Sequence, residues 1–574
     1  MRSTFHTKGW ENANRVYEER LSTCQAPPVD DAICDALNAF VAQRKTDGGV
    51  ATDSWKMKNK QPNFLILMVD QLTGTFWDDG PASFLHAPNL RALHERSVNF
   101  NNAYSPSPLC TPARASFMTG LLPSGTTVYD NAAEFPSNLP TFAHYLRRAG
   151  YYTALSGKMH FVGADQLHGF EDRLTTDIYP ADFGWTPDWR VPYERVDWWY
   201  HNLSSVTEAG VAHTSNQLEY DDEVVYHARR TLLDIARGKD GRPFCLTASF
   251  THPHDPYTAR PKYWDMYEGI DIPAPVVGPL GEEQRDPHSQ RIFNAVDANR
   301  FDVSDEHVKN ARRAYCANIS YLDEKVGELL ETLDECGYGD DTVVVFVSDH
   351  GDMLGERGLW YKMNFFEGAG RIPLSISAPG RFVPRNVSMP ASAMDVLPTL
   401  LELAGVGHSE LVIPLDGQSL VAAAMGEEIS DRLIACEYMA EGSVSTLIML
   451  RQGDWKFVYC ESDPVQLYNL AYDPNELVNL ASVDAHRDTL AHFNALLASR
   501  WSLDALDDDI RENQQRRILC YEALRQGRFT PWDHQPVLNA SERFMRNHLD
   551  LNDVEAGNRV PVRPATPPMN HGSN

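Results

Sequence analysis

A C-x-P-x-R pentapeptide begins at Cys110 and ends at Arg114, and its residue types could carry out nucleophilic chemistry. Pro112 suits the first turn of a helix, which we predict over Ala113–Thr119 with an end at Gly120. Cys110 would then lie at the positive end of the helix dipole, where an anion is attracted. Arg114 offers a planar fork of donors that could hold an oxyanion or orient the nucleophile. A buried structural role is common for any single cysteine, but the full pentapeptide favours a reactive one.

Metal-ligating side chains follow two apolar, strand-like runs, with Asp70 and Gln71 after the first and Asp349 and His350 after the second. Two carboxylates and an amide oxygen are hard ligands, which suit Ca²⁺ because it tolerates irregular oxygen coordination. His350 adds a softer nitrogen donor, so Mn²⁺ is the alternative. Asp70 alone could be a helix cap after a strand, but together with the second pair it favours a metal site. These groups and the cysteine predict a metal-assisted ester hydrolase.

Two further strand-like runs also end in polar chemistry, one at Lys158 and His160 and the other at His252 and His254. From Pro62 on, short continuous apolar runs alternate with amphipathic segments, as expected for parallel strands buried on both faces and joined by crossover helices. Ligands of such sheets bind beyond the carboxyl ends of the strands, so the four ends should converge on one crevice. A lone histidine near a strand end is more often a structural group. The clearest runs are Phe64–Val69, Tyr151–Leu155, Phe244–Phe250 and Thr342–Val347.

The pentapeptide resembles the signature of the sulfatase family, in which the cysteine is oxidised to Cα-formylglycine. Its context in residues 107–116 (SPLCTPARAS) resembles that family, as do residues 157–160 (GKMH) and 348–352 (SDHGD). The resemblance covers roughly residues 62–550 and is strongest to the choline-sulfatase branch, through residues 175–185 (TTDIYPADFGW) and 531–535 (PWDHQ). It implies an alkaline-phosphatase-like α/β fold, with a central, mostly parallel sheet flanked by helices and a smaller C-terminal α+β subdomain.

The resemblance also implies roles for the motif residues. A formylglycine-generating enzyme would convert Cys110 to 3-oxoalanine, whose hydrate carries two hydroxyls: one attacks sulfur and expels the alcohol, and the other then lets sulfate leave. Lys158 and Lys362 would neutralise sulfate oxygens, His160 would take a proton from the hydrate, and His254 would be the acid for the leaving alcohol. Many sulfatases have a second Asp where Gln71 stands and an Asn where His350 stands. The metal ligands would be Asp70, Gln71, the modified Cys110, Asp349 and His350.

Choline sulfate is the substrate that this resemblance implies, hydrolysed to choline and sulfate. A quaternary ammonium cannot donate an N–H bond, so aromatic faces are its natural partners. Core or interface packing is the alternative role for the tryptophans. Residues expected to select the substrate are Asn131, Trp185, Trp198, Trp199, His201 and Asn202. The resemblance further implies a homo-oligomer, a dimer or tetramer, in which the C-terminal tail completes a neighbouring active site.

Composition narrows the class of protein. The formal net charge of −28 argues against nucleic-acid binding, is compatible with a cationic small molecule, and could also simply keep the protein soluble. The nine cysteines are odd in number and contain no C-x-x-C pair, which favours reduced thiols and the cytoplasm. Residues 1–30 contain no apolar signal region, and no run of ~18 apolar residues occurs. We therefore expect no secretion signal and no membrane partner.

Changes in sequence pattern along the 574 residues predict four parts of the chain. Residues 1–60 are expected to form two short polar helices in an appended extension, which weakly resembles the C-terminal tail of trimethylamine methyltransferase-type proteins. Residues 61–405 would be the catalytic domain, 406–515 a subdomain with a small antiparallel sheet backed by a helix near 484–500, and 516–574 a tail in oligomer contact. Two other functions stay open: a phosphonate, phosphate or other sulfate ester hydrolase, and a non-catalytic choline-binding or assembly protein.

Overall fold

The centre of the protein is an eight-stranded sheet with strand order β12-β2-β11-β9-β1-β7-β4-β5. The computed structural model describes residues 61–195, 200–237, 240–427, 429, 432–535 and 550–557. β1 pairs in parallel with β7 and β9, whereas β11 is antiparallel to β9 and β2. The strands of this sheet are β1 (Asn63–Asp70), β2 (Val98–Phe100), β4 (Tyr152–Gly157), β5 (Asp172–Arg173), β7 (Phe244–Pro253), β9 (Thr342–Ser348), β11 (Leu374–Ser377) and β12 (Arg385–Val387).

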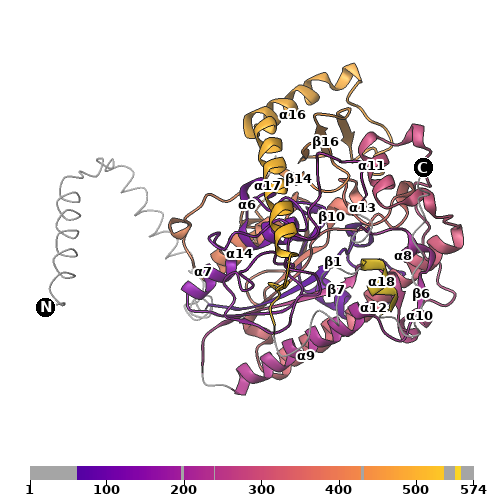
Figure 1. Ribbon diagram of the computed structural model, residues 1–574. Helices are drawn as coiled ribbons and strands as arrows, with labels where there is room; N and C mark the ends of the chain where they lie inside the picture. Colours follow the sequence, from indigo (N-terminus) through magenta and orange to yellow (C-terminus); the bar gives the residue numbers. More distant parts are fainter. Residues whose placement is uncertain are drawn as a thin grey trace, which may run out of the picture. The chain divides into compact units, whose positions relative to one another are not determined.

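Both faces of the sheet are buried, as the continuous apolar runs predict. The side chains of β1 alternate between two cores: Leu65 and Leu67 lie in one, and Ile66 and Met68 lie in the other. The first core contains helices α4 (Pro88–Glu95), α9 (Asn216–Arg237) and α12 (Asp305–Glu335). The second contains α5 (Cys110–Thr119), α7 (Phe142–Arg148) and α14 (Val396–Ala404). Figure 1 shows α9 and α12 side by side on their face of the sheet.

A second, antiparallel sheet has the order β14-β15-β16-β17, with strands β14 (Leu433–Tyr438), β15 (Leu447–Gln452), β16 (Trp455–Cys460) and β17 (Gln466–Asn469). Helix α16 (Arg487–Arg500) packs on it, with the rings of Phe457 and Phe493 stacked 5.5 Å apart. Gly453, at a φ of 56°, permits the tight turn between β15 and β16. The two sheets confirm the predicted fold class.

Helix α17 (Leu503–Leu524) runs across the division expected between residues 515 and 516, and α18 (Leu551–Gly557) follows later in the chain. No helix in the described ranges is long and apolar enough to cross a membrane. The helices expected in residues 1–60 lie outside the described residues. The remaining helices and strands are β3 (Ala103–Tyr104), α6 (Pro123–Thr126), α8 (Ser204–Thr207), β6 (Gly210–Val211), β8 (Thr258–Ala259), α10 (Pro261–Asp265), α11 (Pro287–Ala295), α13 (Glu367–Gly370), β10 (Arg371–Ile372), β13 (Ala391–Ser392) and α15 (Val421–Ala424).

Candidate active site

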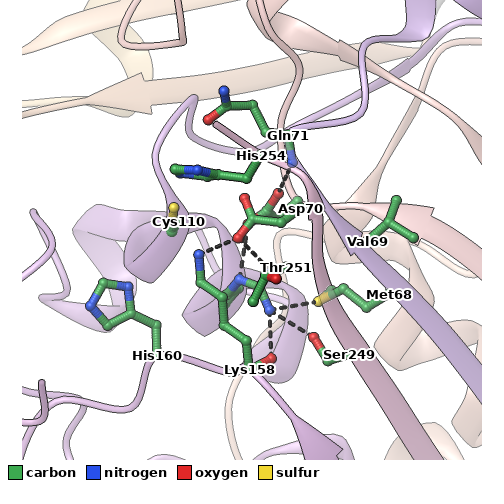
Figure 2. A network of polar contacts seen from close by, with 12 residues as sticks. Met68, Val69, Asp70, Gln71, Cys110, Lys158, His160, Ser249, Thr251 and His254 are labelled. Atoms are coloured by element: carbon green, nitrogen blue, oxygen red, sulfur yellow. Dashed lines mark hydrogen bonds and ion pairs between the residues drawn. The ribbon is translucent and has the colours of Figure 1, made fainter. Parts of the chain in front are cut away.

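The polar ends of four neighbouring strands meet at one edge of the central sheet. Asp70 is the last residue of β1, Lys158 follows β4, His254 follows β7 and Asp349 follows β9. Figure 2 shows the first three of these side chains around Cys110, and all are buried. Because the four strands are parallel, their carboxyl ends necessarily share this edge, which is the expected place for a ligand.

Cys110 is the first residue of α5, and Gly120 ends the helix in the left-handed conformation, with a φ of 71°. Asn131 Oδ1 accepts a hydrogen bond from the backbone N–H of Thr111 at 3.0 Å, which satisfies a donor of the first helical turn. Burial alone would raise the pKa of the Cys110 thiol, but the positive charges of Lys158 and Lys362 bring it well below its ordinary value. An anionic group at position 110 is therefore stabilised.

Four side chains form a cluster that could hold a metal ion. Ligand atoms of Asp70, Cys110, Asp349 and His350 all lie within 4.8 Å of one another. Asp70 Oδ1 is buried and has no hydrogen-bond partner among the described residues. His350 Nδ1 lies 3.1 Å from the carbonyl oxygen of Gly351, which leaves Nε2 facing the cluster. An unpaired carboxylate oxygen and an inward imidazole nitrogen fit a divalent cation.

Gln71 lies between this cluster and Lys362. Its side-chain Oε1 accepts a hydrogen bond from Lys362 Nζ at 2.7 Å, and its Nε2 donates to Asp352 at 2.7 Å. Its backbone N–H donates to Asp349 Oδ1 at 3.0 Å. The backbone N–H of Gln71 therefore orients one carboxylate of the cluster, Asp349, and its side-chain amide orients the neighbouring Lys362 ammonium. Its role as a metal ligand stays a prediction.

Arg114 orients the two carboxylates of the cluster. Its Nε donates to Asp349 Oδ2 at 2.9 Å, and its Nη2 lies 3.4 Å from Asp70 Oδ2. Nη1 donates to the carbonyl oxygen of Lys158 at 2.7 Å and to Ser249 Oγ at 2.9 Å. The guanidinium is fully buried and these donors face protein groups, so its geometry supports orientation of the site rather than contact with an incoming oxyanion.

His160 and Lys158 both pack against the ring of Tyr179. Lys158 Nζ forms an ion pair with Asp70 and lies 4.3 Å from the centre of the Tyr179 ring. The His160 ring stacks on Tyr179 at 5.0 Å and meets Trp185 edge-on at 5.8 Å. Burial lowers the pKa of His160, which favours the neutral imidazole that can accept a proton.

His254 and Lys362 form a close pair of nitrogen atoms. Lys362 Nζ lies 2.6 Å from His254 Nε2, and His254 Nδ1 lies 2.6 Å from the carbonyl oxygen of Asp255. Nδ1 therefore donates to the carbonyl, and Nε2 accepts from the ammonium. Burial alone would raise the pKa of Asp255, but His201 and His254 hold it far below its ordinary value.

A pocket beside Cys110 has several aromatic side chains in its lining. Trp185, Tyr179 and Tyr200 contribute aromatic walls, and the buried carboxyl group of Glu441 belongs to the same lining. Glu441 Oε2 has no hydrogen-bond partner within the described ranges, and burial raises the pKa of this carboxyl to about 7. The complete lining is Cys110, Asn131, His160, Tyr179, Trp185, Tyr200, His201, His254, Ala295, Val296, Tyr361, Lys362, Met363, Glu441 and Leu551.

Comparison with known families matches most of the chain. The Sulfatase profile matches residues 62–406, more than half of the chain, and two further profiles match C-terminal segments. These are the N-sulphoglucosamine sulphohydrolase C-terminal profile over residues 355–501 and the choline sulfatase C-terminal profile over residues 508–560. The chain belongs to the sulfatase family.

Individual relatives agree with this assignment. The sulfatase is 58% identical to the choline-sulfatase of Rhizobium meliloti strain 1021, over 88% of this chain and 99% of that one. It is 27% identical to an arylsulfatase of Clostridium perfringens strain 13, over 76% and 94% of the two chains. The crystal structure of a phosphonate monoester hydrolase of Agrobacterium radiobacter matches with a TM-score of 0.60 at 22% identity, over 76% and 95%. That likeness supports the fold alone.

Most of the predicted site residues of this sulfatase come together. Asn202 does not line the pocket: its Oδ1 accepts from the backbone N–H of Ser204 at 2.8 Å, and its carbonyl accepts from Tyr361 at 2.7 Å. Its place behind the pocket wall makes it a support rather than a contact. Trp198 and Trp199 lie outside the described residues.

Sequence reasoning missed several pocket residues. Tyr179 lies within the stretch 175–185 that carries the family resemblance, so that stretch was a usable signal. Tyr200 and Leu551 carry no motif. Glu441 lies in the loop that follows β14, and nothing in its local sequence points to the active site. Only the docking of the second sheet against the catalytic residues brings this carboxyl group into the pocket.

Proposed function

We propose that this sulfatase hydrolyses choline sulfate to choline and sulfate. The observation that carries the proposal is the pocket, which is lined by the nucleophile at position 110, by aromatic side chains and by one buried carboxyl group. The nucleophile suits a sulfate ester, and the aromatic rings and the carboxyl group suit a quaternary ammonium. The identity to the Rhizobium choline-sulfatase and the C-terminal match over residues 508–560 support the same substrate.

At the sulfate end, we propose a metal held by Asp70, Gln71, Asp349, His350 and the modified residue 110. Ca²⁺ suits the oxygen donors, and Mn²⁺ is the alternative because of the imidazole nitrogen of His350. Such an ion would polarise a sulfate oxygen. As a hydrated aldehyde, residue 110 would supply one hydroxyl for attack on sulfur and a second for the release of sulfate. The unpaired Asp70 Oδ1 supports the metal site.

The surrounding residues would bind sulfate and move protons. Lys158 and Lys362 supply the positive charge for sulfate oxygens. The neutral His160 would accept a proton from residue 110, because its pKa is lowered by burial. A proton held between Lys362 Nζ and His254 Nε2, 2.6 Å apart, would reach the leaving choline oxygen.

At the choline end, the rings of Trp185 and Tyr200 would face the trimethylammonium group, whereas the Tyr179 ring packs against Lys158 and His160. Each cation–π contact contributes about 0.5–2 kcal/mol, depending on how far water is excluded. Glu441 would add the only carboxylate among the described residues that line this pocket. A buried carboxylate close to a cation that lacks N–H donors gives charge recognition without hydrogen bonding, which is the recognition choline requires.

We also propose the setting in which the enzyme works. Free thiols are found at Cys110, Cys245, Cys316, Cys436, Cys460 and Cys520, which supports a reducing compartment such as the cytoplasm. Maturation would need a formylglycine-generating enzyme. A homo-oligomer, with its tail at a neighbouring site, remains a proposal, as do the domain limits 1–60, 61–405, 406–515 and 516–574.

The test is a comparison of kcat/KM for choline sulfate, para-nitrophenyl sulfate and a phosphonate monoester, using enzyme whose residue 110 is converted. This constant reports transition-state binding, so it ranks the substrates directly. We expect choline sulfate to exceed the other two by at least about a hundredfold, equivalent to about 2.7 kcal/mol. An aryl sulfate or a phosphonate that is cleaved faster than choline sulfate would exclude the proposed substrate.

A further inference from the structure

Helix α17 docks on the rest of the protein through a stripe of mostly polar residues. The stripe is Asp507, Ile510, Gln514, Arg517 and Tyr521, spaced three or four residues apart and all buried. Such spacing puts them on one face of the helix. Buried polar side chains are costly unless they are paired, so the partners of this stripe identify what the helix holds.

Arg517 has the strongest of these contacts. Its Nη1 and Nη2 donate to the two carboxylate oxygens of Asp130 at 2.8 and 2.6 Å, which is a bidentate ion pair. Nη1 also donates to Thr186 Oγ1 at 3.0 Å. Arg517 is 5% exposed and Asp130 is fully buried, so the pair is shielded from water. One guanidinium thus joins two loops that are distant in sequence.

Both loops carry a residue of the substrate pocket next to the contact. Asp130 precedes Asn131, which lines the pocket and accepts a hydrogen bond from Thr111, beside the nucleophile. Thr186 follows Trp185, an aromatic wall of the pocket. Displacement of Arg517 would therefore move two parts of the lining, at Asn131 and at Trp185.

Gln514, a second residue of the stripe, supports the part of the pocket lining that contains Glu441. Gln514 Oε1 accepts a hydrogen bond from the backbone N–H of Trp189 at 2.9 Å. Trp189 Nε1 in turn donates to the carbonyl oxygen of Ala440 at 3.2 Å, directly before Glu441. One face of α17 therefore contacts the supports of Asn131, Trp185 and Glu441.

We infer that Arg517 is a positioning residue that sets the geometry of the choline end of the pocket. The inference rests on the proposed function and deepens it. It assigns a physical role to the start of the segment 508–560, where the choline sulfatase C-terminal profile matches and where Arg517 lies. The sulfate end is held by other groups: within the described ranges, Lys158, Lys362, His160 and His254 form no hydrogen bond or ion pair with α17.

The experiment measures the two ends of the pocket separately in Arg517→Lys. Lysine keeps the charge but cannot hold Asp130 and Thr186 with one planar fork. Choline and inorganic sulfate serve as competitive inhibitors that report the two ends. We expect Ki for choline and KM for choline sulfate to rise about tenfold, while Ki for sulfate and kcat/KM for para-nitrophenyl sulfate stay within about twofold.

Two controls separate positioning from loss of folding. Arg516→Met removes the neighbouring arginine, which is 57% exposed and pairs with Glu512 on its own helix; it should leave all four constants unchanged. Arg517→Met would strand the buried Asp130 carboxylate, so it is paired with Asp130→Asn, which removes both charges. That double variant should show the same selective loss of choline binding. Thermal melting of each variant sets a temperature at which all are folded.

Equal weakening of choline and sulfate binding in Arg517→Lys would assign Arg517 a purely structural role and overturn the inference. So would an unchanged Ki for choline in both Arg517 variants. The wild-type enzyme distinguishes this failure from that of the proposed function. If it shows no preference for choline sulfate over para-nitrophenyl sulfate, the proposed substrate is wrong; if it shows the preference and the variants keep it, only the role of Arg517 is wrong.

Discussion

His350 Nε2 lies 3.2 Å from Cys110 Sγ, although 240 residues separate them in the chain. One residue follows strand β9 and the other begins helix α5, so the contact joins the carboxyl edge of the sheet to the positive end of a helix. The same imidazole nitrogen lies 3.8 Å from Asp70 Oδ1 and 3.7 Å from Asp349 Oδ2. The nucleophile therefore lies directly beside the candidate metal ligands. Charge that develops on residue 110 or on sulfate can be stabilised there.

Because its imidazole nitrogen lies beside both carboxylates, His350 should determine which metal ion the site prefers. We expect a chelator to abolish activity, and Ca²⁺ or Mn²⁺ to restore it. His350→Asn replaces the softer nitrogen with an amide oxygen, so it should lower the affinity for Mn²⁺ by about tenfold or more relative to Ca²⁺. Titration calorimetry on the metal-free protein measures both affinities without reliance on turnover. An unchanged ratio of the two affinities would show that this imidazole does not bind the metal.

A second prediction concerns residue 110 itself. Mass spectrometry of its peptide should show the aldehyde in an active preparation, with an intact thiol only in the inactive fraction. Cys110→Ala should lower kcat by at least about 10⁴-fold, because it removes the attacking group. Cys245→Ala changes another buried cysteine, at the start of β7, and should leave kcat within about twofold once folded. Full activity from a preparation with an unmodified thiol would contradict this mechanism.

The strand ends of the site could be predicted from sequence because each is an apolar run that stops at a charged residue. β1 is the clearest case, since its buried residues pass directly to Asp70. The choline end could not be predicted in the same way. Glu441 enters the pocket only through the docking of the second sheet, and the buried face of α17 is polar, so its sequence resembles a solvated helix. Periodicity reports apolar faces, and it does not report faces that dock through ion pairs.

Trp185 should determine selectivity between sulfate esters. Trp185→Ala removes an aromatic wall of the pocket and is expected to raise KM for choline sulfate about 10–30-fold, equivalent to about 1.4–2 kcal/mol. Because its edge-on neighbour His160 is the proposed proton acceptor for residue 110, kcat should also fall slightly. Trp455→Phe changes a tryptophan of β16 that does not line the pocket and serves as the control. A KM that rises equally for para-nitrophenyl sulfate would indicate general collapse of the pocket rather than lost cation recognition.

Lys456 should determine stability rather than catalysis. This fully buried residue of β16 forms ion pairs with Glu367 at 2.9 Å and with Glu476 at 2.8 Å. Lys456→Met leaves the buried Glu476 without its cation and Glu367 with Arg371 alone, which should lower the free energy of unfolding by about 3–5 kcal/mol. Lys262→Met, at an ion pair that is more than half exposed on the lysine side, should change it by less than about 0.5 kcal/mol. Urea unfolding measures both, and equal effects would contradict this assignment.

Glu441 should make choline binding depend on pH near neutrality. Burial, reinforced by Asp130, raises the pKa of its carboxyl to about 7, so the negative charge is present above that pH and is lost as the pH falls through it. We expect Ki for choline to rise about tenfold per pH unit below the break, while Ki for sulfate does not show this break. A bound cation favours the ionised carboxylate, so the corresponding break in kcat should lie at lower pH than that in kcat/KM.

Glu441→Gln tests how the same charge affects the stability of the folded protein. The pKa of the carboxyl is about 7 in the folded protein and 4.5 ordinarily. Between these two pH values the folded state therefore binds more protons than the unfolded state. The free energy of unfolding falls as the pH rises through that range. The glutamine variant should lose this decrease and gain up to about 3 kcal/mol over wild type at about pH 8. It should also bind choline weakly at every pH. A wild-type Ki for choline that does not change between about pH 6 and 8 would show that this carboxyl does not recognise the cation.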